Sequence, residues 1–140
     1  METLLSTVLP ARLEHLEELV KSVSDCARSQ GFDRKRIGEI ELAVEEAFVN
    51  ICRYSYPGKT GDAAISCRLD NNRFMIEIAD SGIPFDITQL SDPDITAPAE
   101  ARGIGGLGIF LVKKMMDAVT YRREGDRNVL NLIVMKEEER

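Results

Sequence analysis

Four glycines lie close together at Gly103, Gly105, Gly106 and Gly108, directly before a run with helical spacing. Backbone amides with no Cβ nearby can approach an anion closely, and the N-terminus of the following helix adds partial positive charge. The loop therefore predicts a phosphate site, with a glycine-rich hinge that binds nothing as the alternative. The glycines formally satisfy GxGxxG, but no strand precedes them and too few residues follow for a Rossmann domain. The chain has no GxxxxGK[ST] motif, which excludes a P-loop.

A second group that could do chemistry is Asp80, which follows the apolar run 74–79 and stands two residues before Gly82. An aspartate at the end of an apolar strand, with a glycine close behind it, presents its carboxylate at the edge of a pocket. There the carboxylate accepts a hydrogen bond from an exocyclic amine such as that of adenine. Residues 83–85 (Ile-Pro-Phe) would form a stiff apolar wall beside it. An ordinary aspartate turn is the alternative for this motif taken alone.

The third group is a pair on one expected helix, Glu46 and Asn50, which stand one turn apart. The apolar positions of this helix make a single stripe that faces the core: Ile37, Ile40, Val44, Phe48 and Ile51. Glu46 and Asn50 project roughly opposite the stripe, beside Leu42 and Val49, and polar groups in a second, partly apolar sector predict a cleft. A glutamate on a helix is most often a solvated charge, whereas asparagine is a poor helix former. Glu46 and Asn50 therefore indicate a functional site only in combination with the glycine loop and Asp80.

The hydrophobic pattern predicts the elements that position these groups. Helices are expected at three ranges: 11–30, 33–54 and 109–117. Strands are expected at five ranges: 3–8, 63–69, 74–79, 118–122 and 129–135. Turns at 70–72 and 124–126 join the second to the third strand and the fourth to the fifth. Because helices and strands mix without strict βαβ alternation, we expect an α+β fold with helices packed on one face of a mixed sheet.

Composition limits the classes of protein that fit. A chain of 140 residues corresponds to one domain, 1–140, at ~100–150 residues per domain, and 44% hydrophobic residues are too many for a disordered chain. The net charge of −6 argues against binding of a nucleic-acid backbone. Three cysteines without a CxxC pair and one histidine argue against a metal site of these residues and for reduced thiols in the cytoplasm. No signal peptide is recognisable, and no apolar segment approaches the ~18 residues of a membrane span.

Taken in order, the three groups resemble a known family. An E-x-x-x-N helix, D-x-G after a strand, a long polar loop and G-x-G-L-G opening a helix form the pattern of GHKL-type (histidine kinase-like) ATPases. The matching segments are EEAFVN (45–50), DSGIPFD (80–86) and GGLGIFLVKKMMD (105–117). Within the family, the chain is most similar to the small bacterial anti-sigma factors that act as serine kinases. The resemblance implies the Bergerat ATP-binding fold, a two-layer sandwich with three helices on one face of a mixed, mostly antiparallel sheet.

The resemblance implies roles for the helix pair and the aspartate. Asn50 would hold the Mg²⁺ that bridges the triphosphate of ATP, and Glu46 would be the general base. One asparagine oxygen suffices, because Mg²⁺ prefers oxygen ligands and keeps several waters beside the phosphates. A glutamate near the γ-phosphate can take a proton from a serine hydroxyl or from water. Asp80 would read the amine of adenine, and Gly82 would let the base approach.

The resemblance also implies how phosphate is bound. Residues 88–102 would be the ATP lid, which we expect to order on the triphosphate, and its last residue, Arg102, would reach the γ-phosphate. The loop would wrap the phosphates through five residues: Gly103, Gly105, Gly106, Leu107 and Gly108. Two features depart from the family pattern. Pro84 stands where many relatives have a second glycine, and the adenine-contacting threonine of a late strand has no clear match, with Asn128 or Val129 nearest.

Two functions from different classes remain open. The first is an ATP-dependent serine kinase that sequesters a sigma factor and phosphorylates a STAS-type anti-anti-sigma protein. The second is a module that binds ATP or ADP as a switch and sequesters a partner without phosphoryl transfer. The length leaves no room for the transducer domain of gyrase-like or MutL-like enzymes, and His15 lacks the sequence context of a phosphoacceptor. A homodimer, and no direct contact with nucleic acid or membrane, complete the expected interactions.

Overall fold

The computed structural model describes residues 1–89 and 106–136, except for the side chain of Leu107. Within these ranges the strands are β1 (Glu2–Pro10), β2 (Asp62–Asp70), β3 (Arg73–Asp80), β4 (Ala118–Glu124) and β5 (Arg127–Met135). The α-helices are α1 (Leu16–Ser29), α2 (Arg34–Asn50) and α3 (Gly106–Met115). Shorter helical turns are the 3₁₀ turns Leu13–His15 and Ile87–Gln89 and the π turn Ile51–Ser55.

The strands form one sheet in the order β1-β2-β3-β5-β4. All four strand pairs among the described residues are antiparallel, whereas the sequence predicted a mixed, mostly antiparallel sheet. Tight turns explain two of the pairs: Asn71 at φ 56° lies between β2 and β3, and Gly125 at φ 62° lies between β4 and β5. A residue with positive φ in a tight turn matches the twist of the two strands of a hairpin. Turns of this length are also too short for the crossover that parallel strands need. Both predicted hairpins are confirmed.

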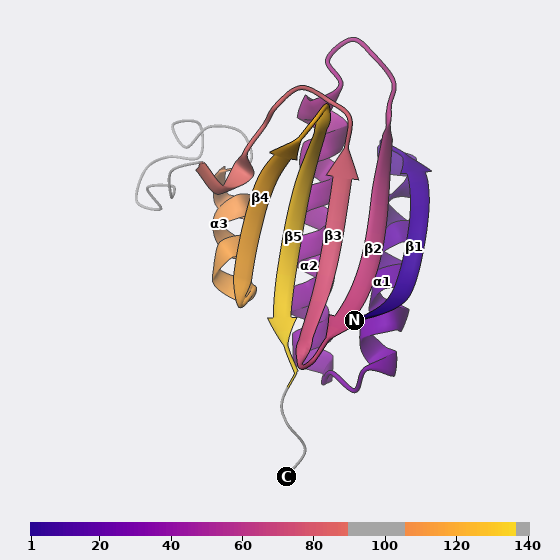
Figure 1. Cartoon of the computed structure of the whole chain (residues 1–140), viewed down its shortest axis with the longest axis vertical. Coiled ribbons are helices and arrows are strands. Elements are labelled where there is room, and N and C mark those ends of the chain that lie inside the picture. Colours follow the sequence, from indigo (N-terminus) through magenta and orange to yellow (C-terminus); the bar gives the residue numbers. More distant parts are fainter. Residues whose placement is uncertain (90–105, 137–140) are drawn as a thin grey trace.

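Three helices cover one face of this sheet, with α2 between α1 and α3 (Figure 1). The arrangement is a two-layer α+β sandwich, which confirms the predicted fold class. The core lies between the layers, and every residue of the stripe predicted for the second helix is buried: Ile37, Ile40, Val44 and Phe48 in α2, and Ile51 at the start of the π turn. The sheet contributes alternate residues of the central strands: Phe74, Ile76, Ile78, Leu130, Leu132 and Val134.

One arginine aligns α3 with α2. Asp33 caps α2 by accepting a hydrogen bond from the Arg36 N–H at 2.8 Å. The Arg36 guanidinium donates to the Met115 carbonyl oxygen and, at 2.8 Å, to Asp117 Oδ2. The C-terminal end of α3 therefore lies against the first turn of α2, so the N-terminal turn of α3 lies toward the other end of α2.

Helix boundaries differ from the predicted ones. The first predicted helix begins as a 3₁₀ turn, and the second is α-helical only as far as Asn50, where the π turn begins. The third begins at Gly106 rather than at residue 109. Glycine destabilises the interior of a helix, but it is tolerated in the first turn, whose amides have no intrahelical partner. Within the described ranges, no helix is long and apolar enough to cross a lipid bilayer.

Candidate functional site

Asn50 and Glu46 lie on the last two turns of α2, and a hydrogen bond fixes the asparagine. The Asn50 side chain is buried, and its Nδ2 donates to the Glu46 carbonyl oxygen at 2.7 Å. In the described part of the chain no donor bonds to Asn50 Oδ1, so this oxygen is available to a ligand. The backbone changes to the π turn directly after Asn50, and π turns are frequent at functional sites.

The Glu46 carboxylate lies against the first turn of α3. A Cβ added to Gly108 would fall 2.0 Å from Glu46 Oε2 and 2.6 Å from its Cδ, so the carboxylate fills the space that a side chain there would need. A carboxylate near a helix N-terminus is stabilised by the partial positive charge of the unpaired amides. The contact brings the predicted general base next to the end of the predicted phosphate loop.

Asp80 ends β3 and is buried. Its Oδ1 accepts two hydrogen bonds of 2.9 Å, one from the Gly82 N–H and one from Asn128 Nδ2. In the described part of the chain no donor bonds to the other oxygen, Oδ2. This oxygen is therefore available to a donor on a ligand.

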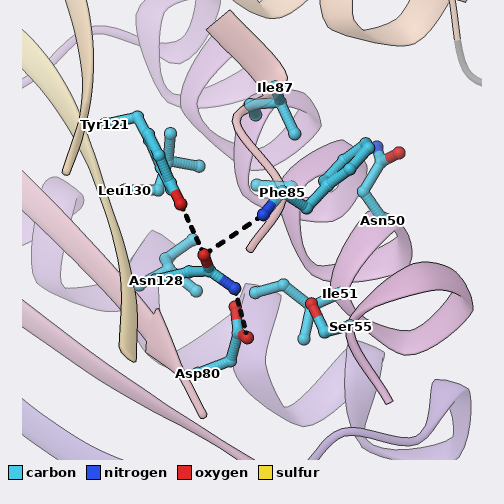
Figure 2. A pocket seen from close by; sticks show the side chains of 11 residues that line it. Asn50, Ile51, Ser55, Asp80, Phe85, Ile87, Tyr121, Asn128 and Leu130 are labelled. Atoms are coloured by element: carbon cyan, nitrogen blue, oxygen red, sulfur yellow. Dashed lines mark hydrogen bonds between the residues drawn. The ribbon is translucent and has the colours of Figure 1, made fainter. Parts of the chain in front are cut away.

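Asp80 and Asn50 line one pocket, whose empty space of about 340 Å³ includes open solvent at its mouth (Figure 2). Its apolar walls are Ala47, Ile51, Ile78, Phe85, Ile87 and Leu130. Its polar lining is Asn50, Ser55, Asp80, Tyr121 and Asn128. Small-molecule sites typically combine apolar walls with a few convergent polar groups, as this pocket does.

Asn128 is the centre of a hydrogen-bond network (Figure 2). From the sequence, Asn128 was named only as one of the two residues nearest to the position of the family's adenine-contacting threonine. Besides Asp80, its Nδ2 reaches the Ile83 carbonyl oxygen at 2.7 Å. Its Oδ1 accepts from three donors: the Tyr121 hydroxyl at 2.6 Å, Arg123 Nη1 at 3.2 Å and the Phe85 N–H at 3.3 Å. The sequence signal that could have identified Asn128 as a site residue was its polar side chain at the start of a strongly apolar strand.

Gly82 packs against the backbone of the π turn. A Cβ at this position would fall 2.1 Å from the Ser55 carbonyl oxygen. The next N–H, that of Ile83, donates to the same oxygen at 2.9 Å. The observed close approach at Gly82 is thus between two segments of this chain, and its predicted role toward an adenine base stays a prediction.

Tyr56 holds the same loop from the other side. Its hydroxyl accepts from the Ser81 N–H at 2.8 Å and donates to the Asp62 carbonyl oxygen at 2.6 Å. Burial raises the pKa of the Tyr56 hydroxyl, so the group stays protonated and keeps this donor role at neutral pH. The loop after β3 is therefore tied to both the π turn and the start of β2.

Gly82→Ala is expected to lower the free energy of unfolding by about 1–3 kcal/mol, the usual cost of extra volume in a packed site. The neighbour is a backbone carbonyl, which cannot swing aside as a long side chain can. Urea denaturation measures the change. Gly38→Ala is the matched control: nothing lies within 4 Å of its added Cβ, and helix propensity should stabilise that variant by about 1 kcal/mol. A Gly82→Ala variant as stable as the wild type would contradict the close packing.

Gly103 and Gly105 of the predicted phosphate loop lie outside the described residues, as does Arg102 of the predicted lid. Gly106 and Leu107 lie with Gly108 in the first turn of α3. Residues 90–102 of the predicted lid are also outside the described residues. The first two residues of the predicted lid, Thr88 and Gln89, lie in the 3₁₀ turn Ile87–Gln89. The Thr88 N–H donates to Asp86 Oδ1 at 2.9 Å.

All three cysteines are free. Burial raises the pKa of the Cys52 thiol to about 11, and burial also raises the pKa of Cys26 and of Cys67. The thiols therefore stay protonated at neutral pH. They supply no nucleophile near the pocket.

The sequence matches the family described as the histidine kinase-like ATPase domain over residues 9–134. It is similar to the serine-protein kinase RsbW of Bacillus cereus, with 30% identity over 126 residues that cover 87% of this chain and 79% of the relative. RsbW of Bacillus anthracis gives the same identity and coverage. The resemblance inferred from the three motifs, and the serine-kinase class of relatives that it implied, are confirmed.

Two solved structures share the fold. One is a chain of the SiaB–SiaC complex from Pseudomonas aeruginosa, with a TM-score of 0.66, 14% identity and coverage of 95% of this chain and 91% of that chain. The other contains the RsbU and RsbW domains of a Mycobacterium tuberculosis protein, with a TM-score of 0.63 and 14% identity. The match covers 94% of this chain and 32% of that longer chain. At this identity the similarity shows the fold alone.

Proposed function

The chain belongs to the histidine kinase-like ATPase family, and on this premise we propose that it is a Mg²⁺- and ATP-dependent serine protein kinase. The observation that supports the proposal most is the contact of the Glu46 carboxylate with Gly108 in the first turn of α3. Asn50, whose Oδ1 is available, stands one turn further along α2. Glu46 and Asn50 thus lie at the end of α2 that meets the first turn of α3, and Asn50 also lines the pocket that contains Asp80.

The pocket suits the base of ATP. Its apolar walls would pack against the faces of a purine ring, and Asp80 stands among them as an acceptor. An ionised carboxylate only accepts hydrogen bonds, so Oδ2 of Asp80 matches the 6-amino group of adenine.

The residues at the α2–α3 end suit the triphosphate and its metal. Asn50 Oδ1 is a neutral oxygen ligand of the kind that Mg²⁺ takes together with phosphate oxygens and water. When bound, Mg²⁺ would neutralise charge on the phosphates during transfer. The amides at the start of α3, with Gly103, Gly105 and Gly106, would bind phosphate oxygens, and Arg102 would add a positive charge at the γ-phosphate.

Glu46 would be the general base. Its carboxylate would accept the proton of the attacking serine hydroxyl as the hydroxyl oxygen bonds to the γ-phosphorus. The bond from this phosphorus to the β,γ-bridging oxygen would break at the same time, and ADP would leave. Positioning and charge neutralisation supply most of the catalysis in phosphoryl transfer, and a base contributes ~10²–10⁴-fold. The absence of a side chain at Gly108 gives the carboxylate room beside the helix N-terminus.

The proposed phosphoacceptor is a serine of a STAS-type anti-anti-sigma protein, and the sequestered target is a sigma factor or an equivalent regulator. Both assignments follow from the family resemblance, and the name of the relatives, serine-protein kinase RsbW, supports a serine as the acceptor. A homodimer and a cytoplasmic location belong to the same proposal. The net charge of −6 supports a protein partner over a nucleic acid.

A transfer assay tests the proposal. The chain is incubated with Mg²⁺, γ-labelled ATP and a STAS-type protein from the same organism, and the labelled residue is located by mass spectrometry. We expect label on a serine of the STAS protein, and its loss when Mg²⁺ is chelated. Nucleotide-dependent binding of the partner without any transfer would instead support the second candidate, a nucleotide-switched binding module.

A further inference from the structure

Asn128 is more heavily bonded than any role described so far requires. We infer that Asn128 is a positioning residue that sets the purine selectivity of the pocket, because it holds Asp80 with only Oδ2 free for the base. The inference rests on the proposed function, since it assigns a further residue to the same nucleotide site. The observation that supports it is the network of hydrogen bonds around the buried side-chain amide of Asn128.

The sheet places the amide beside the carboxylate. Asp80 and Asn128 are direct partners in the antiparallel ladder of β3 and β5. Asp80 Oδ1 receives Asn128 Nδ2 and the Gly82 N–H, each at 2.9 Å. Rotation of the carboxylate would break both bonds, so the side chain is held in one orientation and Oδ2 remains the free acceptor.

Three donors fix the orientation of the amide itself. The Tyr121 hydroxyl, Arg123 Nη1 and the Phe85 N–H all point at Asn128 Oδ1. The flipped amide would set its NH₂ group against these donors and its carbonyl oxygen against the Asp80 carboxylate. Because that arrangement pairs donors with donors and acceptors with acceptors, the network permits one orientation only.

The same amide also holds a wall of the pocket. The backbone N–H of Phe85 donates to Asn128 Oδ1, and the Phe85 ring lines the pocket with its centroid 5.7 Å from the ring centroid of Tyr54. Asn128 therefore joins the carboxylate that would read the edge of the base to an apolar side chain that would pack on its face.

A carboxylate of Asp80 held in one orientation discriminates between adenine and guanine by the group at position 6 of the purine ring. Oδ2 can accept from the 6-amino group of adenine, whereas the 6-oxo group of guanine presents a second acceptor. A hydrogen bond to a charged group changes affinity by about 10- to 100-fold. A carboxylate free to rotate would turn toward other donors or water and lose most of this discrimination.

Two ligands distinguish the positioning role from a merely structural one: ATP, and purine riboside triphosphate, which lacks only the 6-amino group. Calorimetry gives the ratio of their affinities. The wild type should bind ATP about 10- to 100-fold more tightly than the analogue. Asn128→Val should reduce the ratio to about threefold or less, because no donor from β5 then holds Asp80. Asn128→Thr, which has nearly the shape of valine and a hydroxyl donor, should restore much of the ratio.

Asn131→Val is the matched control. Asn131 is also a buried asparagine of β5, but it lies on the other face of the sheet, so its loss should leave the ratio unchanged. Tyr121→Phe is the second variant, for use if Asn128→Val does not fold. It removes one donor from the Asn128 amide and should reduce the ratio about threefold.

The outcomes separate the inference from the proposed function. An unchanged ratio in Asn128→Val, or in Tyr121→Phe where the first variant does not fold, overturns the inference. An equal loss of affinity for both triphosphates also overturns it, since that result means a structural role. A wild type that binds both ligands equally overturns the inference and leaves the proposed function standing. A wild type that binds neither overturns both.

Discussion

Glu46→Gln is expected to lower the rate of phosphoryl transfer to the partner serine by about two orders of magnitude, while the affinity for ATP stays within a few-fold. Glutamine keeps the shape of the side chain, which packs against Gly108. It removes the negative charge and, with it, the ability to accept the proton of the serine hydroxyl. Single-turnover transfer from γ-labelled ATP measures the rate, and calorimetry measures the affinity.

Glu45→Gln is the control for this change. Glu45 is the adjacent residue on α2 and has the same charge, but its side chain is exposed about 100° further around the helix. Its substitution should leave the transfer rate nearly unchanged. If the two variants behave alike, or if Glu46→Gln keeps full transfer, Glu46 is not the base.

Asn50→Ala is expected to weaken Mg²⁺-dependent binding of ATP by about tenfold or more, because it deletes the oxygen that we assign to the metal. The fold should persist, since alanine is the best helix former and the lost hydrogen bond is local to α2. Calorimetric titration with ATP and Mg²⁺ measures the change, and thermal unfolding checks the fold.

The same titration with a chelator is the internal control for Asn50. Without metal, wild type and variant should bind ATP with similar affinity, because the deleted oxygen then has no ligand. A variant that matches the wild type in the presence of Mg²⁺ would remove Asn50 from the metal site.

The fold could be predicted because its elements carry strong local signals. The apolar stripe of the second predicted helix repeats at helical spacing over four turns, and each of its five residues is buried. Asn71 and Gly125 mark hairpins through a positive φ that other residues rarely adopt. Helix ends were less predictable: α2 gives way to a π turn after Asn50, and the last residue of that turn, Ser55, packs against the loop after β3, a segment distant in the sequence.

The site was predictable only in part, because its contacts join distant segments. Residue types and order pointed to Glu46, Asn50 and Asp80. The pairing of Asp80 with Asn128 depends on the register of β3 against β5, and a hydrophobic pattern gives the face of a strand but leaves its register open. The space that Glu46 occupies at Gly108 likewise arises from the packing of α2 on α3, which no local spacing encodes.

The most direct measurement is the calorimetric titration of the wild-type chain with ATP, with and without Mg²⁺. The proposed site predicts saturable binding at a single site per chain, with higher affinity when Mg²⁺ is present. Absence of binding at millimolar ATP with Mg²⁺, under conditions where the chain is folded, would contradict the assignment of this pocket as a Mg·ATP site.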